Sequence, residues 1–303
     1  MLQLATHPAC RAHRNGPWHP ESPERLGPLL ARLESELVAR GAAAWREAPL
    51  AEPEDVLRVH TAEHLRHLEA LDRSGGGVLD PDTAMGPDSL AAALRASGAA
   101  IAGVEQAMAG AGPVFCPVRP PGHHATPSRA MGFCLLNHVA IAARVGLDRF
   151  DAARVLIVDW DVHHGNGTAD AFRMEPRVRY VSLHQWPYYP GTGAEDDVGV
   201  GNLFHVPRPP GLPRERYVAD LLAAVDRSLA GFAPDVVLFS AGFDALAGDP
   251  LGGFTLEPED YAGLTREIRA RAGGAPAVSV LEGGYDPDRL ADAALAHAEA
   301  LAV

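Results

Sequence analysis

The chain has 303 residues, of which 47% are hydrophobic and 21% are charged, a composition typical of a globular protein large enough to fold without disulfide bonds. Its 39 acidic residues outnumber 26 basic ones, all of which are arginines, so the formal net charge is −13 and lysine is absent. This charge disfavours a nucleic-acid partner, whose phosphates it would repel, and the absence of lysine excludes Schiff-base and P-loop chemistry.

The first part of the chain is predicted to be mainly helical. A Ser-Pro pair, followed by apolar residues at helical spacing and a closing glycine, predicts a helix over residues 23–40. Residues 54–71 predict one or two short helices, and residues 89–109 predict a long alanine-rich helix. Between them, residues 73–88 contain three consecutive glycines and two prolines, so we expect a loop there.

From residue 113 onward, short apolar runs alternate with helical segments. The predicted strands are residues 113–118, 154–160, 178–184, 202–207, 235–240 and 277–282. The predicted helices are residues 137–145, 169–172, 214–229, 257–272 and 288–300. Because the strands are apolar throughout, they should be buried on both faces, which predicts an α/β fold with a central parallel sheet and helices on both faces. With no repeat and no low-complexity linker, we expect one domain over residues 1–303.

The three cysteines, Cys10, Cys116 and Cys134, predict neither a disulfide framework nor a cysteine zinc site, because their number is odd and no Cys-x-x-Cys motif occurs. No apolar run is long enough to span a membrane, and the first residues lack the apolar core of a secretory signal. We therefore expect a cytoplasmic protein without a membrane partner.

Residues whose side chains can bind metal or transfer protons follow four of the predicted strands. They are His123 and His124, then Asp159, Asp161, His163 and Asn166, then Asp244, and finally Tyr285. Ligands of open α/β sheets bind beyond the carboxyl ends of the strands, so these four loops are expected to meet at one site.

A metal centre is the first chemistry that this pattern predicts. In an extended segment, Asp161 and His163 point the same way, and Asp244 could complete an Asp/His/Asp set. Three protein ligands with one open position are typical of a catalytic zinc. The alternative, that Asp159 and Asp161 only cap the next helix, would explain their own segment but not the polar residues at the other strand ends.

His123, His124 and Tyr285 predict proton transfer and oxyanion stabilisation beside that metal. Two imidazoles could divide the uptake and delivery of a proton, with Asp159 and Asn166 as candidate orienting partners. Tyr285 follows two glycines, which allow its phenol to reach a site and donate to a carbonyl oxygen. Read alone, each of these side chains would also be compatible with a packed or rim position.

The motifs HPESPERL, RPPGHHA, GFCLLNH, DWDVHHGNGT, SLHQ, YPGTG, AGFDALAGDPLGG and LEGGY follow one another along the chain. In this set and order the chain resembles the zinc-dependent histone deacetylase superfamily. The details are most similar to its class II branch, with bacterial deacetylase-like amidohydrolases and acetylpolyamine amidohydrolases as further members. The resemblance runs from residue 19 to Tyr285 and implies a single-domain arginase/deacetylase-like fold.

The resemblance also implies a role for each site residue. Asp161, His163 and Asp244 would bind Zn²⁺, with Fe²⁺ or Co²⁺ as substitutes in this oxygen-rich set. The implied catalytic residues are His124 as general base and acid, His123 beside it, Asp159 and Asn166 as their partners, and Tyr285 as the group that polarises the substrate carbonyl. Many relatives carry Asp where this chain has Asn166, so we expect His124 to be neutral near pH 7.

Two further sets are implied by the resemblance. Phe133 and Tyr189 would form the walls of a narrow acyl-lysine-sized channel, although the family usually has Phe at the second position. The other channel residues would be Gly132, Leu251 and Asp82. A structural K⁺ site would use Asp159, Asp161, His163, Ser182 and Leu183.

The implied activity is metal-dependent hydrolysis that removes an acetyl or other acyl group from acyl-lysine or a related acylated amine. An acetylpolyamine amidohydrolase is the nearest alternative: the acidic net charge suits polyamines, whereas Leu251 offers no carboxylate for a second ammonium group. A ureohydrolase on a similar fold would need a second metal set, which the sequence does not show. A non-catalytic acyl-lysine binding protein is the alternative of another class. The oligomeric state stays open.

Overall fold

The computed structural model describes residues 1–303 and centres on an eight-stranded sheet whose order is β2-β1-β5-β10-β9-β6-β7-β8. All neighbouring pairs in this sheet are parallel. The strands are β1 Leu2–Thr6, β2 Ala43–Glu47, β5 Val114–Cys116, β6 Val155–Asp159, β7 Val178–Gln185, β8 Leu203–Arg208, β9 Val236–Ala241 and β10 Ala277–Leu281. Every residue of β6, β9 and β10 is buried, as expected for strands covered on both faces.

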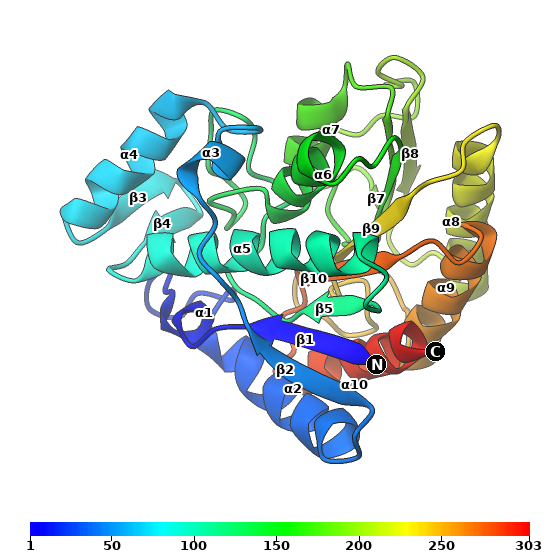
Figure 1. Ribbon diagram of the computed structural model, residues 1–303, viewed down its shortest axis with the longest axis horizontal. Helices are drawn as coiled ribbons and strands as arrows, with labels where there is room; N and C mark the ends of the chain where they lie inside the picture. Colours follow the sequence, from blue (N-terminus) through cyan, green and yellow to red (C-terminus); the bar gives the residue numbers. More distant parts are fainter.

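Helices cover both faces of the sheet (Figure 1). They are α1 Ala9–Ala12, α2 Leu26–Leu33, α3 Pro53–Val56, α4 Ala62–Arg73, α5 Ser89–Met108, α6 His138–Arg149, α7 Asn166–Phe172, α8 Arg214–Leu229, α9 Pro258–Arg271 and α10 Pro287–Ala302. Helices α5 and α6 pack against each other on one side, whereas α2, α10, α9 and α8 pack in succession on the other. None of the helices combines the length and hydrophobicity needed to cross a bilayer.

Local signals in the sequence explain where several helices begin. Asn137 caps α6 by accepting a hydrogen bond from the Ala140 amide, and Asp286 caps α10 by accepting one from the Arg289 amide. Glu257 and Asp260 form a reciprocal capping box at the start of α9. These caps matter for the site because α10 follows directly after Tyr285, and α6 begins close behind the His123–His124 loop.

Two predictions for the first hundred residues were wrong in detail. The continuous helix expected over 23–40 is broken into a 3₁₀ turn at Pro23–Arg25, helix α2, and a π-helical turn at Glu34–Val38, and the Ser22 side chain makes no capping hydrogen bond. The loop expected over 73–88 contains an antiparallel hairpin of β3 Gly77–Asp80 and β4 Thr83–Met85. Gly76 permits this close approach, because a Cβ there would lie 2.1 Å from the Met85 carbonyl oxygen.

Strands β1 and β2 have no counterpart among the predicted elements. Strand β1 (LQLAT) contains polar Gln3 and Thr6, and β2 (AAWRE) lies at the edge of the sheet with four of its five residues at least partly exposed. Neither strand therefore shows the continuous apolar run by which the central strands are recognised. Their addition extends the sheet beyond β5 and places the N-terminal loop next to the site.

Candidate active site

The four strands followed by chemically active residues are neighbours in the sheet, in the order β5-β10-β9-β6. Their parallel directions bring the loops after all four strands to one edge. This is why His123, Asp161, Asp244 and Tyr285, which are far apart in the sequence, lie together. The convergence follows from strand order alone and does not depend on any single loop conformation.

Asp161, His163 and Asp244 form the centre of the site and are all buried. Nδ1 of His163 lies 3.0 Å from Oδ1 of Asp161 and 3.2 Å from Oδ2 of Asp244. The other carboxylate oxygens are fixed by backbone amides: Gly283 donates to Asp161 Oδ2 at 2.8 Å, and Val162 donates to Asp244 Oδ1 at 2.7 Å. Backbone amides of the surrounding loops therefore hold both carboxylates in place.

Several observations show that this set fits a cation. Oδ2 of Asp244 is buried without a hydrogen-bond partner, although the His163 ring is near. A Cβ on Gly283 would lie 2.1 Å from this oxygen and 2.6 Å from Oδ2 of Asp161, so glycine keeps space beside both. Burial and the Asp161 carboxylate raise the pKa of Asp244 to about 7, which a positive ion would reverse. One nitrogen and carboxylate oxygens suit a divalent metal.

His123 and His124 lie beside this set with ring centroids 4.0 Å apart, but their partners differ. Nδ1 of His123 is 3.0 Å from Oδ2 of Asp159, which also accepts a hydrogen bond from the Tyr180 hydroxyl at 2.8 Å. Burial lowers the pKa of His123, but the carboxylates of Asp161 and Asp159 outweigh it and raise that pKa well above its usual value. His123 is therefore set up to carry a proton.

His124, in contrast to His123, favours the neutral form of its ring. Its Nδ1 lies 2.8 Å from Oδ1 of Asn166, while the Asn166 amide nitrogen donates to the His124 carbonyl at 3.3 Å. Burial and the neighbouring His123 and His163 hold the pKa of His124 well below its usual value, so the ring is neutral at pH 7. Because Nδ1 donates to the amide oxygen, the lone pair is on Nε2.

Tyr285 is positioned by two residues that sequence reasoning missed. Asp249 accepts a hydrogen bond from the Tyr285 amide at 2.7 Å, and its other oxygen accepts one from the Leu251 amide at 2.9 Å. The Arg25 guanidinium lies 4.8 Å from the centre of the Tyr285 ring and donates to the Gly284 carbonyl at 2.6 Å. Burial raises the pKa of Tyr285 well above its usual value, so the hydroxyl keeps its proton.

A pocket of about 260 Å³ leads to these groups. His124, His163 and Tyr285 line it, together with the five residues expected in the channel: Asp82, Gly132, Phe133, Tyr189 and Leu251. Tyr188 also lines it and was missed, although its ring stacks on His163 at 5.4 Å. A narrow aromatic passage ending at the metal-binding set suits an extended acyl-amine chain.

The comparisons with known proteins agree with this geometry. The family model described as "Histone deacetylase domain" matches residues 19–301.

The chain belongs to the histone deacetylase family.

A protein of Methanothermobacter thermautotrophicus described as a probable deacetylase is 37% identical over 278 residues, which are 90% of this chain and 82% of that protein. A histone deacetylase-like amidohydrolase of Pseudomonas aeruginosa is 39% identical, over 88% of this chain and 72% of that one. The crystal structure of the HDA15 HD domain superposes with a TM-score of 0.95 at 35% identity, covering 99% of this chain and 88% of that one. This family member is therefore a deacetylase-type hydrolase that acts on amide bonds, on the α/β fold that the sequence predicted.

Of the residues expected to bind K⁺, Asp159 lies on β6 and Ser182 and Leu183 lie on β7, whereas Asp161 and His163 belong to the metal-binding set of the deacetylase site. Asp159 and Ser182 stand opposite each other where β6 pairs with β7, and Leu183 follows on the same strand. Asp159, Asp161, Ser182 and Leu183 are all buried. Oγ of Ser182 lies 3.0 Å from Nδ1 of His184, so this hydroxyl has a protein partner in the structure.

The residues that sequence reasoning missed in this deacetylase lay inside motifs that it had found. Arg25 belongs to HPESPERL, Tyr188 directly precedes YPGTG, and Asp249 belongs to AGFDALAGDPLGG. Spacing within a loop does not determine where each side chain points, so the motif indicated the loop but not the inward-facing residue.

Proposed function

We propose that this deacetylase removes an acetyl or other acyl group from the side-chain amine of acyl-lysine, with Zn²⁺ held by Asp161, His163 and Asp244. The observation that carries the proposal is the meeting of this ligand set with His124 and Tyr285 at the base of one narrow pocket. We assign the whole of residues 1–303 to one catalytic domain. Fe²⁺ or Co²⁺ would fit the same donors, and K⁺ is assigned to the buried set around Asp159 and Ser182.

When bound, zinc supplies a Lewis acid that lowers the pKa of water and polarises the acyl carbonyl. Nε2 of the neutral His124 accepts a proton from the attacking water, because Asn166 holds the ring with its other nitrogen protonated. The Tyr285 hydroxyl donates a hydrogen bond to the carbonyl oxygen as negative charge develops on it. A new C–O bond forms, the C–N bond breaks, and the proton taken up by His124 passes to the departing amine. The products are a free amine and acetic acid, which becomes acetate when it releases the second proton of the water.

His123 and Asp159 orient this machinery. The Asp159 carboxylate holds His123, and a positive charge on that ring opposes protonation of its neighbour His124. His124 therefore stays a base until it has taken a proton from water. The two histidines differ in role because their partners, a carboxylate and a neutral amide, differ in charge.

Acyl-lysine is favoured over acetylpolyamines by the residues around the pocket. Leu251 at the rim offers no charge, and Asp82 is the only acidic residue that lines the passage above the metal-binding set. An acetylated polyamine with two remaining ammonium groups, such as N-acetylspermidine, would need more than one acidic partner at this rim. The net charge of −13 is the observation that favours polyamines.

The test is a kinetic panel. Acetyl-, trifluoroacetyl- and longer acyl-lysine peptides are compared with N-acetylputrescine and N-acetylspermidine under identical conditions. The proposal predicts the highest kcat/KM for an acyl-lysine peptide. A higher value for an acetylpolyamine would replace the proposed substrate class, and zinc binding without turnover of any acyl amide would favour a non-catalytic binder.

We place this reaction in the cytoplasm. The three cysteines, Cys10, Cys116 and Cys134, are all free and buried, which agrees with a reducing compartment.

A further inference from the structure

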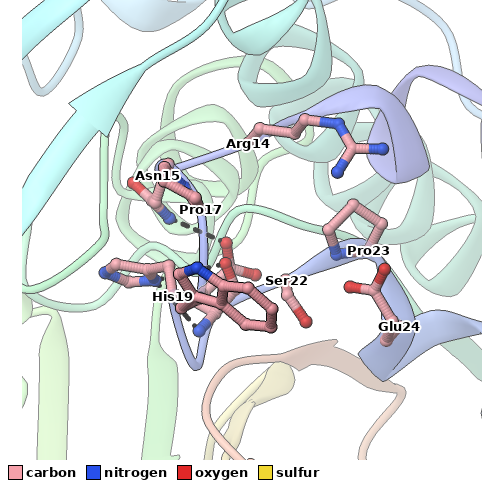
Figure 2. A pocket seen from close by; sticks show the side chains of 10 residues that line it. Arg14, Asn15, Pro17, His19, Ser22, Pro23 and Glu24 are labelled. Carbon is pink, nitrogen blue, oxygen red and sulfur yellow. Dashed lines mark hydrogen bonds between the residues drawn. The ribbon is translucent and has the colours of Figure 1, made fainter.

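A second pocket, of about 360 Å³, lies within the segment Arg14–Glu24. Figure 2 shows the Arg14 guanidinium and the Glu24 carboxylate on one side of it and the His19 ring on the other. The floor is held by Glu21, which pairs with Arg119 and Arg25 and accepts a hydrogen bond from Asn15 at 2.9 Å. Because Glu21 is completely buried and paired, the pocket has a fixed base.

His19 connects this pocket to two residues that line the deacetylase channel. Its ring makes an edge contact with Phe133 at 4.6 Å, and its Nε2 lies 3.2 Å from the Asp82 carbonyl oxygen. Phe133 and Asp82 both line the channel, whereas His19 lines the second pocket. The second pocket therefore lies beside the channel, with the His19 ring between them.

Trp18 precedes His19 and lines the second pocket. Its relative exposure is 102%, so the indole is not packed against the rest of the chain. Its backbone φ is +61°, in the left-handed region that only glycine adopts without cost. The chain thus places one of its four tryptophan side chains in water on a strained backbone. Such a residue is a candidate for binding a partner.

The polar groups around Trp18 suit a peptide backbone. Arg14 supplies hydrogen-bond donors and Glu24 supplies acceptors, and both side chains are exposed. A polypeptide presents carbonyl acceptors and amide donors in alternation, whereas a polyamine presents donors only. An indole beside such groups provides a rigid apolar platform for a neighbouring residue.

We propose that the Arg14–Glu24 pocket is a subsite for the polypeptide that carries the acyl-lysine, and that Trp18 contacts the residues flanking it. This rests on the proposed function and deepens it, because it selects acyl-lysine within a polypeptide over a free acylated amine. A small substrate ends at the channel mouth, but a peptide continues past His19 onto Trp18.

The first test separates the two substrate sizes with three variants. Trp18→Gly removes the indole and relieves the backbone strain, Trp18→Ala removes the indole only, and Trp18→Phe keeps an aromatic ring. We expect Trp18→Gly and Trp18→Ala to raise KM for an acetyl-lysine heptapeptide at least fivefold, while kcat changes less than twofold. Trp18→Phe should keep KM close to the wild-type value. For Nε-acetyl-lysine with blocked termini, all three variants should differ little from one another.

Control variants distinguish a loss of peptide binding from a loss of folding stability. Met174 is 75% exposed and lines neither pocket, so Met174→Ala should leave both substrates unaffected. Trp18→Gly should unfold at the same temperature as the wild type or higher, because glycine accepts a φ of +61°. If the wild type turns over no acyl amide, the proposed function fails. If it turns over both substrates and Trp18→Gly leaves the peptide KM unchanged, only the subsite proposal is overturned.

The second test needs no turnover. Acrylamide quenching of tryptophan fluorescence is measured with and without a heptapeptide in which a ketone isostere replaces acetyl-lysine. We expect the peptide to reduce quenching in the wild type and to have no such effect in Trp18→Phe. Equal effects in both proteins would overturn the contact. If the peptide does not change quenching in the wild type, and Trp18→Gly changes the sedimentation coefficient, Trp18 would instead be assigned to self-association.

Discussion

At the scale of single residues, the site depends on the free space beside the Asp161 and Asp244 carboxylates as much as on the contacts that these carboxylates make. Gly283 lies against both carboxylates of the metal-binding set, and its amide donates to Asp161. Any side chain at this position would occupy the space between Asp161 and Asp244. The requirement for glycine here is steric, because the Gly283 backbone is not in the left-handed region.

Gly283→Ala is therefore expected to weaken zinc binding by roughly 100-fold or more while leaving the fold intact, since an added Cβ would lie 2.1 Å from Oδ2 of Asp244. Zinc affinity is measured by competition with a chromophoric chelator. Gly263→Ala in α9 is the matched control, because a Cβ there meets nothing and alanine favours helix. Wild-type zinc affinity in Gly283→Ala would show that the ion binds elsewhere.

At the scale of elements, the segment before α2 is tied to the loop between β10 and Tyr285. Arg25 pairs with Glu21 and donates to the Glu282 carbonyl at 2.6 Å, directly after β10. Burial would raise the pKa of Glu21, but Arg119, His13 and Arg25 together hold it well below 4.5. The folded protein therefore binds this proton less readily than the unfolded chain, and the resulting stability is present above pH 4.5 and lost as the pH falls through the folded pKa.

Glu21→Gln should lower the free energy of unfolding at pH 7 by about 3–5 kcal/mol, because it leaves the buried Arg119 without a counter-charge. The difference between wild type and variant should shrink as the pH falls below 4.5, because Glu21 of the unfolded wild type takes up a proton there while the folded protein still keeps the carboxylate charged. Urea titrations between pH 7 and pH 3.5 measure both. A difference that stays constant with pH would mean that Glu21 contributes through packing and not through charge.

The central strands and the helices α4 and α5 could be predicted from the sequence, whereas the N-terminal strands β1 and β2 could not. Strands β6, β9 and β10 are continuous apolar runs because both faces are buried, and this leaves a clear pattern. Strand β1 (LQLAT) is interrupted by polar residues, and β2 (AAWRE) ends in two charged ones, so neither shows such a run. The π-helical turn at Glu34–Val38 depends on how α2 packs, which local pattern does not encode.

In the site, too, some residues could be predicted from the sequence and others could not. Asp161 and His163 could be placed together from their spacing, and Asp244 and Tyr285 from the strand-end rule. Asp249 and Arg25 could not, because their contacts depend on the paths of two loops across one another. Residues fixed by periodicity were accessible to sequence reasoning, and residues fixed by loop paths were not.

At the scale of the whole molecule, the net charge of −13 creates an attractive field for cationic substrates. We expect kcat/KM for an acetyl-lysine peptide flanked by two arginines to fall several-fold between about 10 and 300 mM NaCl, since salt screens this attraction. A peptide with neutral flanks should change much less. Equal salt dependence for both peptides would mean that the charge does not assist substrate approach.

The most direct test of the account is a zinc titration of the metal-stripped protein, with hydrolysis of an acetyl-lysine peptide as the readout. We predict that activity is absent without metal, rises with added Zn²⁺ and saturates at one ion per chain, and that Asp244→Ala abolishes both binding and activity. Full activity in the metal-stripped protein, or tight zinc binding that survives Asp244→Ala, would contradict a single catalytic ion held by Asp161, His163 and Asp244.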